Sequence, residues 1–377
     1  MTEPFAGAFR GKRVFLTGHT GFKGSWMAEW LIQLGAEVVG YSHEIPAGTS
    51  LFRQLGLEQR MTHIIGDVRD HAALNDAVAA ARPDFVFHLA AQALVRYSYD
   101  HPIETFATNV MGTANLLDVL RGLGRPTACV VVTSDKCYDN REVLTGYRED
   151  DAFGGKDPYS ASKGAAEIVA QSFLRSYFAA ADTPVRLATA RAGNVIGGGD
   201  WAEDRIVPDC IRHLSKGEPI GVRNPAATRP WQHVLEALSG YLWLGAMLSG
   251  AATTPHVNRP SDVCEGFNFG PWVNANVPVG RLVEEVLKHW PGQWMKVGDA
   301  QAKPEASLLG LSIDKAFHKL QWQPTMDFAE NVEMTTNWYR NVVGGRVSAT
   351  EQTDADIRSY IEKSREKAIS WACTEPT

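Results

Sequence analysis

A glycine-rich turn near the N-terminus constrains this chain more than any other feature. Residues 18–24 read Gly-His-Thr-Gly-Phe-Lys-Gly, a G-x-x-G-x-x-G spacing. The short apolar run 14–17 before the turn predicts a buried parallel strand, and the amphipathic run 25–34, closed by Gly35, predicts a helix. A loop could hold the same glycines, but a strand before and a helix after favour a pyrophosphate site at the helix N-terminus. The predicted cofactor contacts of the turn are Gly18, Thr20, Gly21, Phe22, Lys23 and Gly24.

Strand and helix patterns alternate through the first half of the chain. Six apolar runs predict the strands of a doubly wound parallel α/β (Rossmann) sheet, at residues 14–17, 37–41, 63–66, 84–89, 128–132 and 185–190. After Arg191 the sequence becomes glycine-rich, with many Pro and Trp, which indicates a smaller, mixed α/β C-terminal substrate domain. We therefore expect a dinucleotide-binding domain of residues 1–193 plus about 231–260, and a substrate domain of 194–230 plus about 261–377.

Composition excludes several classes of function. The net charge of −6 and the lack of a Lys/Arg run disfavour nucleic-acid binding. No apolar run approaches the ~20 residues of a membrane span, and the N-terminus lacks the features of a signal peptide. The 5 cysteines are scattered without a C-x-x-C pair, which predicts free thiols, no metal site and a cytoplasmic protein.

The carboxyl ends of the strands supply further candidate cofactor contacts, because parallel strands present ligands there. The second strand ends at Ser42, where an acid for the ribose 2′-hydroxyl is usual; Glu44 comes two residues late, so NADP stays open beside NAD. His43 could contact a 2′-phosphate or be a solvated loop residue. Asp67 could accept from the adenine amino group or cap a turn. The other predicted contacts are Val68, Leu89, Ala90, Ala91 and Thr133.

Tyr159 and Lys163 are four residues apart, so they share one face of a predicted helix. A nearby ammonium lowers the pKa of a phenol, which would make Tyr159 a base for a hydroxyl group. The spacing also occurs in ordinary amphipathic helices, but here it follows a nucleotide-binding pattern. Ser134, Asp135 and Lys136 follow the fifth strand and suggest acid–base chemistry there, or a salt-bridged turn.

Six stretches carry a resemblance to a known family. They are T-G-H-T-G-F-K-G-S-W at 17–26, H-L-A-A-Q-A-L-V-R-Y-S-Y at 88–99, T-S-D-K-C-Y at 133–138, G-Y-R-E-D-D at 146–151, D-P-Y-S-A-S-K-G at 157–164 and R-A-G-N-V-I-G-G-G-D-W at 191–201. The chain resembles the extended short-chain dehydrogenases/reductases to about Pro324, and among them the CDP-glucose 4,6-dehydratase subfamily. The dTDP-glucose dehydratases carry Asp-Glu where this chain has Asp135-Lys136.

The resemblance implies a redox-neutral dehydration with NAD as cofactor. Tyr159 would take the C4 hydroxyl proton, Ser134 would hydrogen-bond the C4 oxygen, and Lys163 would hold the nicotinamide ribose. Water would then leave from C5 and C6, with Asp135 protonating the C6 hydroxyl. Lys136 would take the C5 proton, or would stabilise the enolate as a cation.

The substrate contacts are also implied by the resemblance. Asn194, Arg205 and Arg229 would surround the diphosphate of a nucleotide sugar, Arg96 would lie near the sugar, and Glu305 would meet the nucleoside. Arg191 and Arg223 are further arginines of this region whose guanidinium suits a diphosphate.

A homodimer packed through helices near 102–120 and 159–178 is expected on the same ground. The alternatives are a nucleotide-sugar 4-epimerase or dehydrogenase on the same fold, and a non-catalytic dinucleotide sensor.

Overall fold

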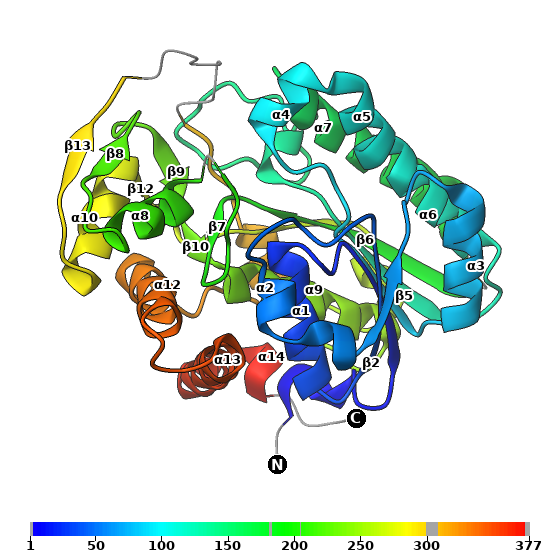
Figure 1. Ribbon diagram of the computed structural model, residues 1–377. Helices are drawn as coiled ribbons and strands as arrows, with labels where there is room; N and C mark the ends of the chain where they lie inside the picture. Colours follow the sequence, from blue (N-terminus) through cyan, green and yellow to red (C-terminus); the bar gives the residue numbers. More distant parts are fainter. Residues whose placement is uncertain (1–2, 181–182, 204, 299–307, 374–377) are drawn as a thin grey trace.

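A seven-stranded parallel sheet forms the centre of the molecule, with helices on both faces (Figure 1). The computed structural model describes residues 3–180, 183–203, 205–298 and 308–373. The strand order is β11-β6-β5-β4-β1-β2-β3, and every neighbouring pair is parallel. The strands are β1 (Arg13–Thr17), β2 (Glu37–Ser42), β3 (Thr62–Ile65), β4 (Phe85–His88), β5 (Thr127–Val132), β6 (Val185–Ala192) and β11 (Gly266–Phe269). The predicted doubly wound α/β sheet is confirmed.

The central strands are apolar because both of their faces are covered. Every residue of β4 and β5 is buried, which explains their nearly continuous apolar sequences. One core lies between the sheet and the helices α1 (Phe22–Gln33) and α9 (Val234–Ser249). The second lies under α3 (His71–Ala81), α6 (Gly112–Arg121) and α7 (Pro158–Phe173). The order of strands reverses between β1 and β4, so the ligand crevice is expected at their carboxyl ends.

Helix α7, which carries Tyr159, begins where the sequence provides a cap. The Asp157 carboxylate accepts a hydrogen bond from the Ser160 N–H at 2.9 Å, and Pro158 occupies the first turn, where no N–H is needed. The other helices are α2 (Leu51–Gln54), α4 (Val95–Asp100), α5 (Pro102–Phe106), α8 (Ile206–Leu214), α10 (Val279–His289), α11 (Asp314–Leu320), α12 (Phe328–Val343), α13 (Ala349–Glu366) and α14 (Ser370–Cys373).

Short paired strands and two helices form a smaller layer beside the sheet, at the left of Figure 1. The pairs are β7 (Val195–Ile196) with β10 (Gln232–His233), β8 (Ile220–Val222) with β13 (Trp294–Lys296), and β9 (Thr228–Pro230) with β12 (Asn276–Pro278). Helices α8 and α10 pack in the same layer. One strand differs from expectation: β11 lies in the range 261–377 assigned to the substrate domain, yet it pairs with β6 in the main sheet.

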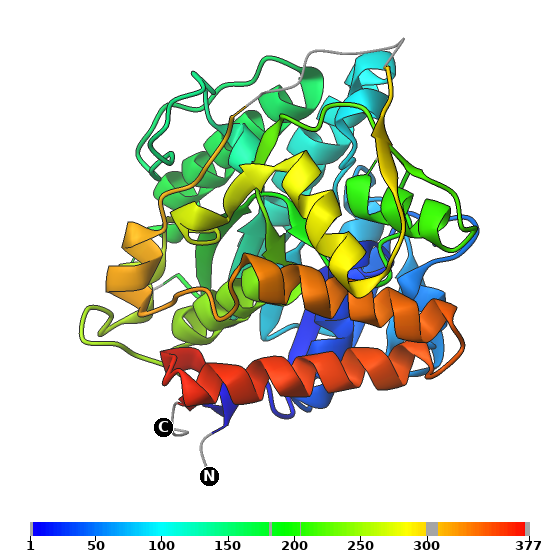
Figure 2. The ribbon, with the colours of Figure 1, turned by 90° about the vertical axis from the view of Figure 1, so that its left-hand side faces the viewer.

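The C-terminal helices α12 and α13 run along the lower edge of the molecule in Figure 2. Helix α13 contacts α1, where the Gln33 side chain donates to Asp354 at 2.6 Å. Phe5 near the N-terminus stacks on Trp371 of α14, with ring centroids 4.9 Å apart. Helices α13 and α14 are therefore packed onto α1 and the N-terminal segment.

Candidate active site

The glycine turn between β1 and α1 has the shape that the spacing predicts. Gly18 has φ +76°, and a Cβ there would lie 2.7 Å from the backbone nitrogen of Ala90, just after β4. A Cβ at Gly24 would lie 2.1 Å from the carbonyl oxygen of Gly18. No side chain caps the N-terminus of α1, where Gly21 is the N-cap. The first N–H groups of the helix are therefore available to an anion such as a pyrophosphate.

The side chain of His19 links the glycine turn to strands β2 and β3 by hydrogen bonds. Its Nδ1 lies 2.9 Å from the Ser42 Oγ and its Nε2 lies 2.6 Å from Nδ1 of His63. Burial, with a smaller contribution from His63, lowers the pKa of His19 to about 3, so its ring is neutral. The backbone N–H of Thr20 also donates to Ser42, at 3.4 Å. Ser42, at the end of β2, thus holds the glycine turn in place through its contacts with His19 and Thr20.

Asp67 follows β3, as predicted, but its carboxylate is already bound. Arg69 donates to both oxygens, and Nη2 lies 2.6 Å from Oδ2. Burial would raise the pKa of Asp67, yet the hydrogen bonds and charge of Arg69, and the charge of His43, bring it below its usual value. Val68 is buried, and Leu89 lies against Gly18 at the end of β4.

Ser134, Asp135 and Tyr159 come together at the carboxyl end of β5, in the short helix η4 (Asp135–Cys137) and at the start of α7. All three are buried, at 6%, 2% and 8% exposure. The Ser134 hydroxyl donates to Oδ1 of Asp135 at 2.9 Å, and Ser134 is also hydrogen-bonded to the Tyr159 side chain. Oδ2 of Asp135 is buried and has no hydrogen-bond partner in the described part of the chain. The arrangement offers a phenol, a hydroxyl and a carboxyl group to one substrate.

The pKa of Tyr159 differs from the prediction. Burial raises it to about 12, the hydrogen bond with Ser134 lowers it and the charge of Asp135 raises it further. The sequence analysis expected a lowered pKa, whereas burial makes the pKa of Tyr159 higher than that of a free phenol; the effect of Lys163 on Tyr159 stays a prediction. The Lys163 ammonium donates to the carbonyl oxygen of Val132 at 3.5 Å. Burial lowers the pKa of Lys163 to about 8, against the opposing charge of Glu167.

A buried ion pair, which the sequence analysis missed, lies behind this cluster. Arg191 at the end of β6 donates through Nε and Nη2 to the two carboxylate oxygens of Glu167, both at 2.9 Å. Thr133 and Thr189 donate their hydroxyls to the same carboxylate, at 2.5 and 2.8 Å. Arg191 is therefore unavailable to a diphosphate, and the Thr133 hydroxyl is committed to Glu167 rather than to a cofactor. Glu167 and Arg191 lie on different elements, α7 and β6, so no local spacing in the sequence indicates their pairing.

Gly193, next to the predicted substrate residue Asn194, lies beside the Asp135 carboxylate. A Cβ at Gly193 would lie 2.9 Å from Oδ2 of Asp135 and 3.1 Å from Cγ of Pro230, which places the residues next to Asn194 and Arg229 in the sequence close to this oxygen.

Arg205 precedes α8, forms an ion pair with Asp200 at 2.9 Å, and acts electrostatically on Tyr159. Arg96 lies half-buried on α4, and Lys136 half-buried in η4. Ala91 is half-buried two residues after Leu89. Glu305 lies outside the described residues.

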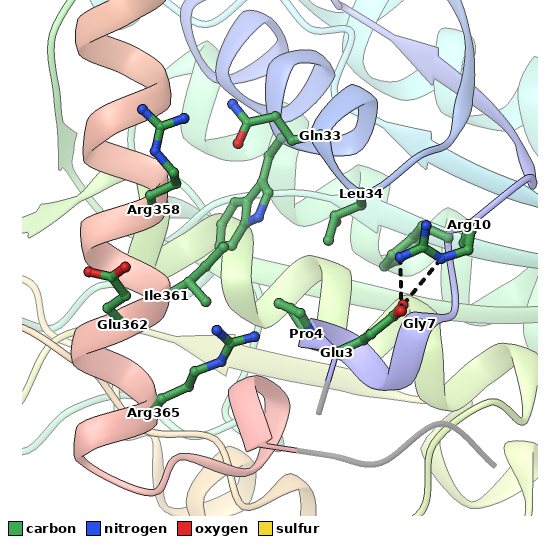
Figure 3. Close-up of a pocket in the computed structure, with 12 residues that line it drawn as sticks. Glu3, Pro4, Gly7, Arg10, Gln33, Leu34, Arg358, Ile361, Glu362 and Arg365 are labelled. Carbon is green, nitrogen blue, oxygen red and sulfur yellow. Dashed lines mark hydrogen bonds and ion pairs between the residues drawn. The ribbon is translucent and has the colours of Figure 1, made fainter. Parts of the chain in front are cut away.

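A surface pocket of about 340 Å³ lies elsewhere, between the N-terminal segment, α1 and α13 (Figure 3). It surrounds the end of α1 opposite the glycine turn, at Gln33 and Leu34. Arg10 at its rim is paired with Glu3 at 2.8 Å. None of the predicted site residues lines it.

Two broader features bear on the kind of site. Among the described residues, no group of three or more His, Cys, Asp or Glu side chains could hold a metal ion. Within the same ranges, no helix is long and apolar enough to cross a bilayer.

Known proteins match the chain over most of its length. The family model for GDP-mannose 4,6 dehydratase matches residues 15–335. A CDP-glucose 4,6-dehydratase from Salmonella typhimurium is 45% identical over 341 residues, which are 89% of this chain and 93% of that protein. A UDP-glucose 4-epimerase from Mycoplasma pneumoniae is 25% identical, over 87% of this chain and 97% of its own length.

Solved structures share the fold. The dTDP-glucose 4,6-dehydratase DesIV from Streptomyces venezuelae, solved with NAD and TYD bound, gives a TM-score of 0.73 at 23% identity, over 88% of this chain and 98% of its own. A UDP-glucose 4-epimerase from Thermotoga maritima, solved with UDP-glucose, gives 0.71 at 21% identity, over 88% and 99%. The family model covers far more than half of the sequence, and the motifs at 17–26, 133–138, 157–164 and 191–201 lie inside the match. The chain therefore belongs to the GDP-mannose 4,6 dehydratase family, among the extended short-chain dehydrogenases/reductases.

Proposed function

We propose that this protein converts CDP-glucose to CDP-4-keto-6-deoxyglucose by an NAD-dependent, redox-neutral loss of water. One observation carries the proposal. A buried tyrosine, serine and aspartate meet beyond β5, in a chain 45% identical to a CDP-glucose 4,6-dehydratase. An epimerase or a simple dehydrogenase has no need of a proton donor for a departing hydroxyl group, which is the role that Asp135 fits here.

NAD fits the residues at the carboxyl ends of the strands. The turn at Gly18 and Gly24 has no room for side chains, and the uncapped start of α1 provides N–H donors for a pyrophosphate. Lys163 would hold the nicotinamide ribose, and Ser42, Asp67 and Val68 would border the adenosine. When bound, NAD supplies a hydride acceptor for C4 and a hydride donor for C6.

Tyr159 is the proposed base for the C4 hydroxyl. In the protein alone its pKa is about 12, so at neutral pH the phenol keeps its proton. The C4 hydroxyl of the substrate, hydrogen-bonded to Ser134, would favour the phenolate form of Tyr159. The positive charge of the oxidised nicotinamide would favour it as well. Proton transfer from the C4 hydroxyl to Tyr159 would then accompany oxidation at C4.

Asp135 is the proposed acid for the elimination. The C4 ketone acidifies the C5 proton, which Lys136 would remove, while Asp135 would protonate the C6 oxygen as the C6–O bond breaks. The unpartnered Oδ2 of Asp135 is the atom that could carry this proton. Water leaves with one proton from Asp135, so atoms and charge balance.

The arginines beside this carboxyl group are proposed to hold the diphosphate. Asn194 and Arg229 are sequence neighbours of Gly193 and Pro230, which lie beside Asp135, and the charge of Arg205, just before α8, acts on Tyr159. Guanidinium groups bind diphosphate oxygens in pairs. Arg96 would contact the sugar, and Glu305 remains a predicted contact of the nucleoside.

We further propose a homodimer built on α5, α6 and α7, which lie together on one outer side of the molecule (Figure 1). Large apolar side chains are exposed there: Ile103 is 80% exposed, Met111 55% and Ile168 57%. Large apolar side chains exposed on helices that pack together are compatible with a protein interface.

We also propose a cytoplasmic location. The 5 cysteines are free, which supports it, because free thiols are typical of a reducing compartment.

A substrate panel tests the proposed function. The purified protein would be incubated with CDP-, dTDP-, GDP- and UDP-glucose, and the products measured by mass spectrometry. We expect loss of one water from CDP-glucose without net NADH. Turnover of another sugar nucleotide in preference would overturn the choice of substrate, and tight NAD binding without any turnover would favour a sensor.

A further inference from the structure

The backbone of Tyr159 is held from outside its own helix. The first N–H groups of an α-helix have no acceptor within the helix, so those that are buried need one elsewhere. In α7, Pro158 at the first position has no N–H. The Asp157 carboxylate accepts from the N–H of Ser160 at 2.9 Å, and its carbonyl oxygen accepts from Ala161, also at 2.9 Å. The N–H of Tyr159, between them, finds its acceptor on a different helix.

Ser98 on α4 supplies that acceptor. Its hydroxyl oxygen lies 3.2 Å from the backbone nitrogen of Tyr159, and α4 lies beside the start of α7 (Figure 1). The same hydroxyl donates its proton to the carbonyl oxygen of Val95 at 2.7 Å, so it is an acceptor toward Tyr159. Ser98 is 0% exposed. Without this oxygen, the N–H of Tyr159 would be left buried and unpaired unless the start of α7 moved.

A second serine holds the carbonyl group of Tyr159. Ser162 donates its hydroxyl to the Tyr159 carbonyl oxygen at 2.7 Å and accepts from Nδ2 of Asn109 at 2.8 Å. Asn109 also binds both backbone groups of Gln92, at 2.8 and 3.0 Å. Gln92 lies in the segment between β4 and α4. The segment that leads into α4 is therefore tied to the same turn of α7 that Ser98 contacts.

The position of this backbone decides where the phenol of Tyr159 lies. The ring is rigid and its side chain is buried, at 8% exposure, so a shift of the backbone is passed on to the phenol oxygen. Proton transfer needs the reacting atoms at about 3–3.5 Å, and a misplacement of about 1 Å can slow a reaction roughly 100-fold. A contact that fixes the backbone of Tyr159 is thus expected to act on the rate of the chemistry.

We infer that Ser98 is a positioning residue for the base Tyr159, because it fixes the start of α7 so that the phenol meets the C4 hydroxyl of the substrate. The inference rests on the proposed dehydratase function. In the step concerned, the C4–H bond breaks and its electron pair passes to NAD as hydride. The C4 hydroxyl proton passes to the phenolate of Tyr159, and the C4 ketone forms. Ser98 neither gains nor loses a proton.

A single-turnover experiment with CDP-glucose, unlabelled or deuterated at C4, tests this role. In Ser98→Ala, product formation should slow about tenfold or more, because the phenol is no longer held in place for the first proton transfer. The isotope effect on this rate should be at least as large as in the wild type, since the hydride transfer is the step that slows. In the steady state kcat should fall while KM stays within about twofold, as expected for an interaction that serves the transition state.

Ser249→Ala is the matched control. At the end of α9, the Ser249 hydroxyl donates to the carbonyl oxygen of Ala246 at 2.7 Å and accepts from the N–H of Ala251 at 3.3 Å. Ser98 has the same pattern of one carbonyl acceptor and one N–H donor. Ser249→Ala should therefore turn over substrate at the wild-type rate, even if its melting temperature falls as much as that of Ser98→Ala.

Amide hydrogen exchange tests the contact without turnover. In the wild type, the amide of Tyr159 should be protected about as well as that of Ala161, which is bonded within the helix turn. In Ser98→Ala, exchange at Tyr159 should speed up about tenfold or more while Ala161 stays protected. Thermal unfolding and NAD binding show whether the variant folds. If it does not fold, the wild type decides alone: an amide of Tyr159 that exchanges far faster than that of Ala161 would overturn the inference.

The outcomes distinguish the two proposals. If the wild type does not dehydrate CDP-glucose, the proposed function falls, whereas the exchange data still show whether Ser98 holds Tyr159. If the wild type dehydrates CDP-glucose and Ser98→Ala does so at the same rate, the inference alone is overturned. Equal slowing in Ser98→Ala and Ser249→Ala would overturn it as well, because the effect would then be a general loss of stability.

Discussion

Removing the Arg191 side chain should destabilise the fold strongly, because it leaves a buried carboxylate without its cation. Glu167 is 0% exposed and Arg191 1%. Of the four hydrogen bonds to Glu167, Arg191→Met removes two and leaves those of Thr133 and Thr189. Breaking a buried pair by removing one partner costs about 3–5 kcal/mol.

The corresponding change in melting temperature follows from chain size. Unfolding entropy is about 2.1 cal/mol/K per residue, or about 0.8 kcal/mol/K for this chain, so Tm should fall by about 4–6 °C. Differential scanning calorimetry of Arg191→Met measures this shift. Arg121→Met is the matched control, because Arg121 pairs with Asp118 at the surface, with side chains 51% and 39% exposed. An exposed pair contributes about 0–1 kcal/mol, so this variant should melt nearly as the wild type does.

The double variant Glu167→Met/Arg191→Met tests whether the unpaired charge of Glu167 causes the loss of stability in Arg191→Met. It removes both charges from the interior, so it should recover at least half of the loss seen in Arg191→Met. Two results would refute the reasoning. One is a loss under about 1 kcal/mol in Arg191→Met, and the other is a double variant as unstable as the sum of the two single variants.

Three further changes test other parts of the account. Gly18→Ala should abolish NAD binding in equilibrium dialysis, because its Cβ would lie 2.7 Å from the backbone nitrogen of Ala90; unchanged affinity would contradict the assigned turn. Asp135→Asn should still oxidise C4 but lower kcat by about 100-fold or more, with bound NADH accumulating; a normal kcat would exclude Asp135 as the acid. Burial raises the pKa of Asp356 from 3.8 to about 7, so the native state binds the extra proton and stability should fall as pH rises from about 4 to 7, by at most about 4 kcal/mol. Asp356→Asn should remove that decline in urea unfolding at pH 5 and pH 8, and an unchanged decline would show that another group causes it.

Local sequence was enough to predict the strand, turn and helix around Gly18. The apolar run, the glycines and the amphipathic helix are all short-range signals, and the structure confirms the sheet that they imply. Ser134, Asp135 and Tyr159 could be expected to meet, because a strand end and the following helix converge at one edge of a parallel sheet. The structure brings these three side chains together.

Long-range features were not predictable in this way. Strand β11 has four residues and a buried Asn268, so its sequence carries little strand signal. The pair of Arg191 with Glu167 and the contact of His19 with His63 join distant parts of the chain. The raised pKa of Tyr159 was not predicted, because its main cause is burial, a tertiary property. Such effects depend on packing that no local pattern encodes.

Incubation of the protein with CDP-glucose in deuterium oxide tests the central claim most directly. If an oxidised C4 acidifies C5 and water then leaves, the product should weigh one water less, apart from the label, should carry a solvent deuteron at C5, and should form without net NADH. A product of unchanged mass without deuterium at C5, or NADH formed in proportion to product, would contradict the account.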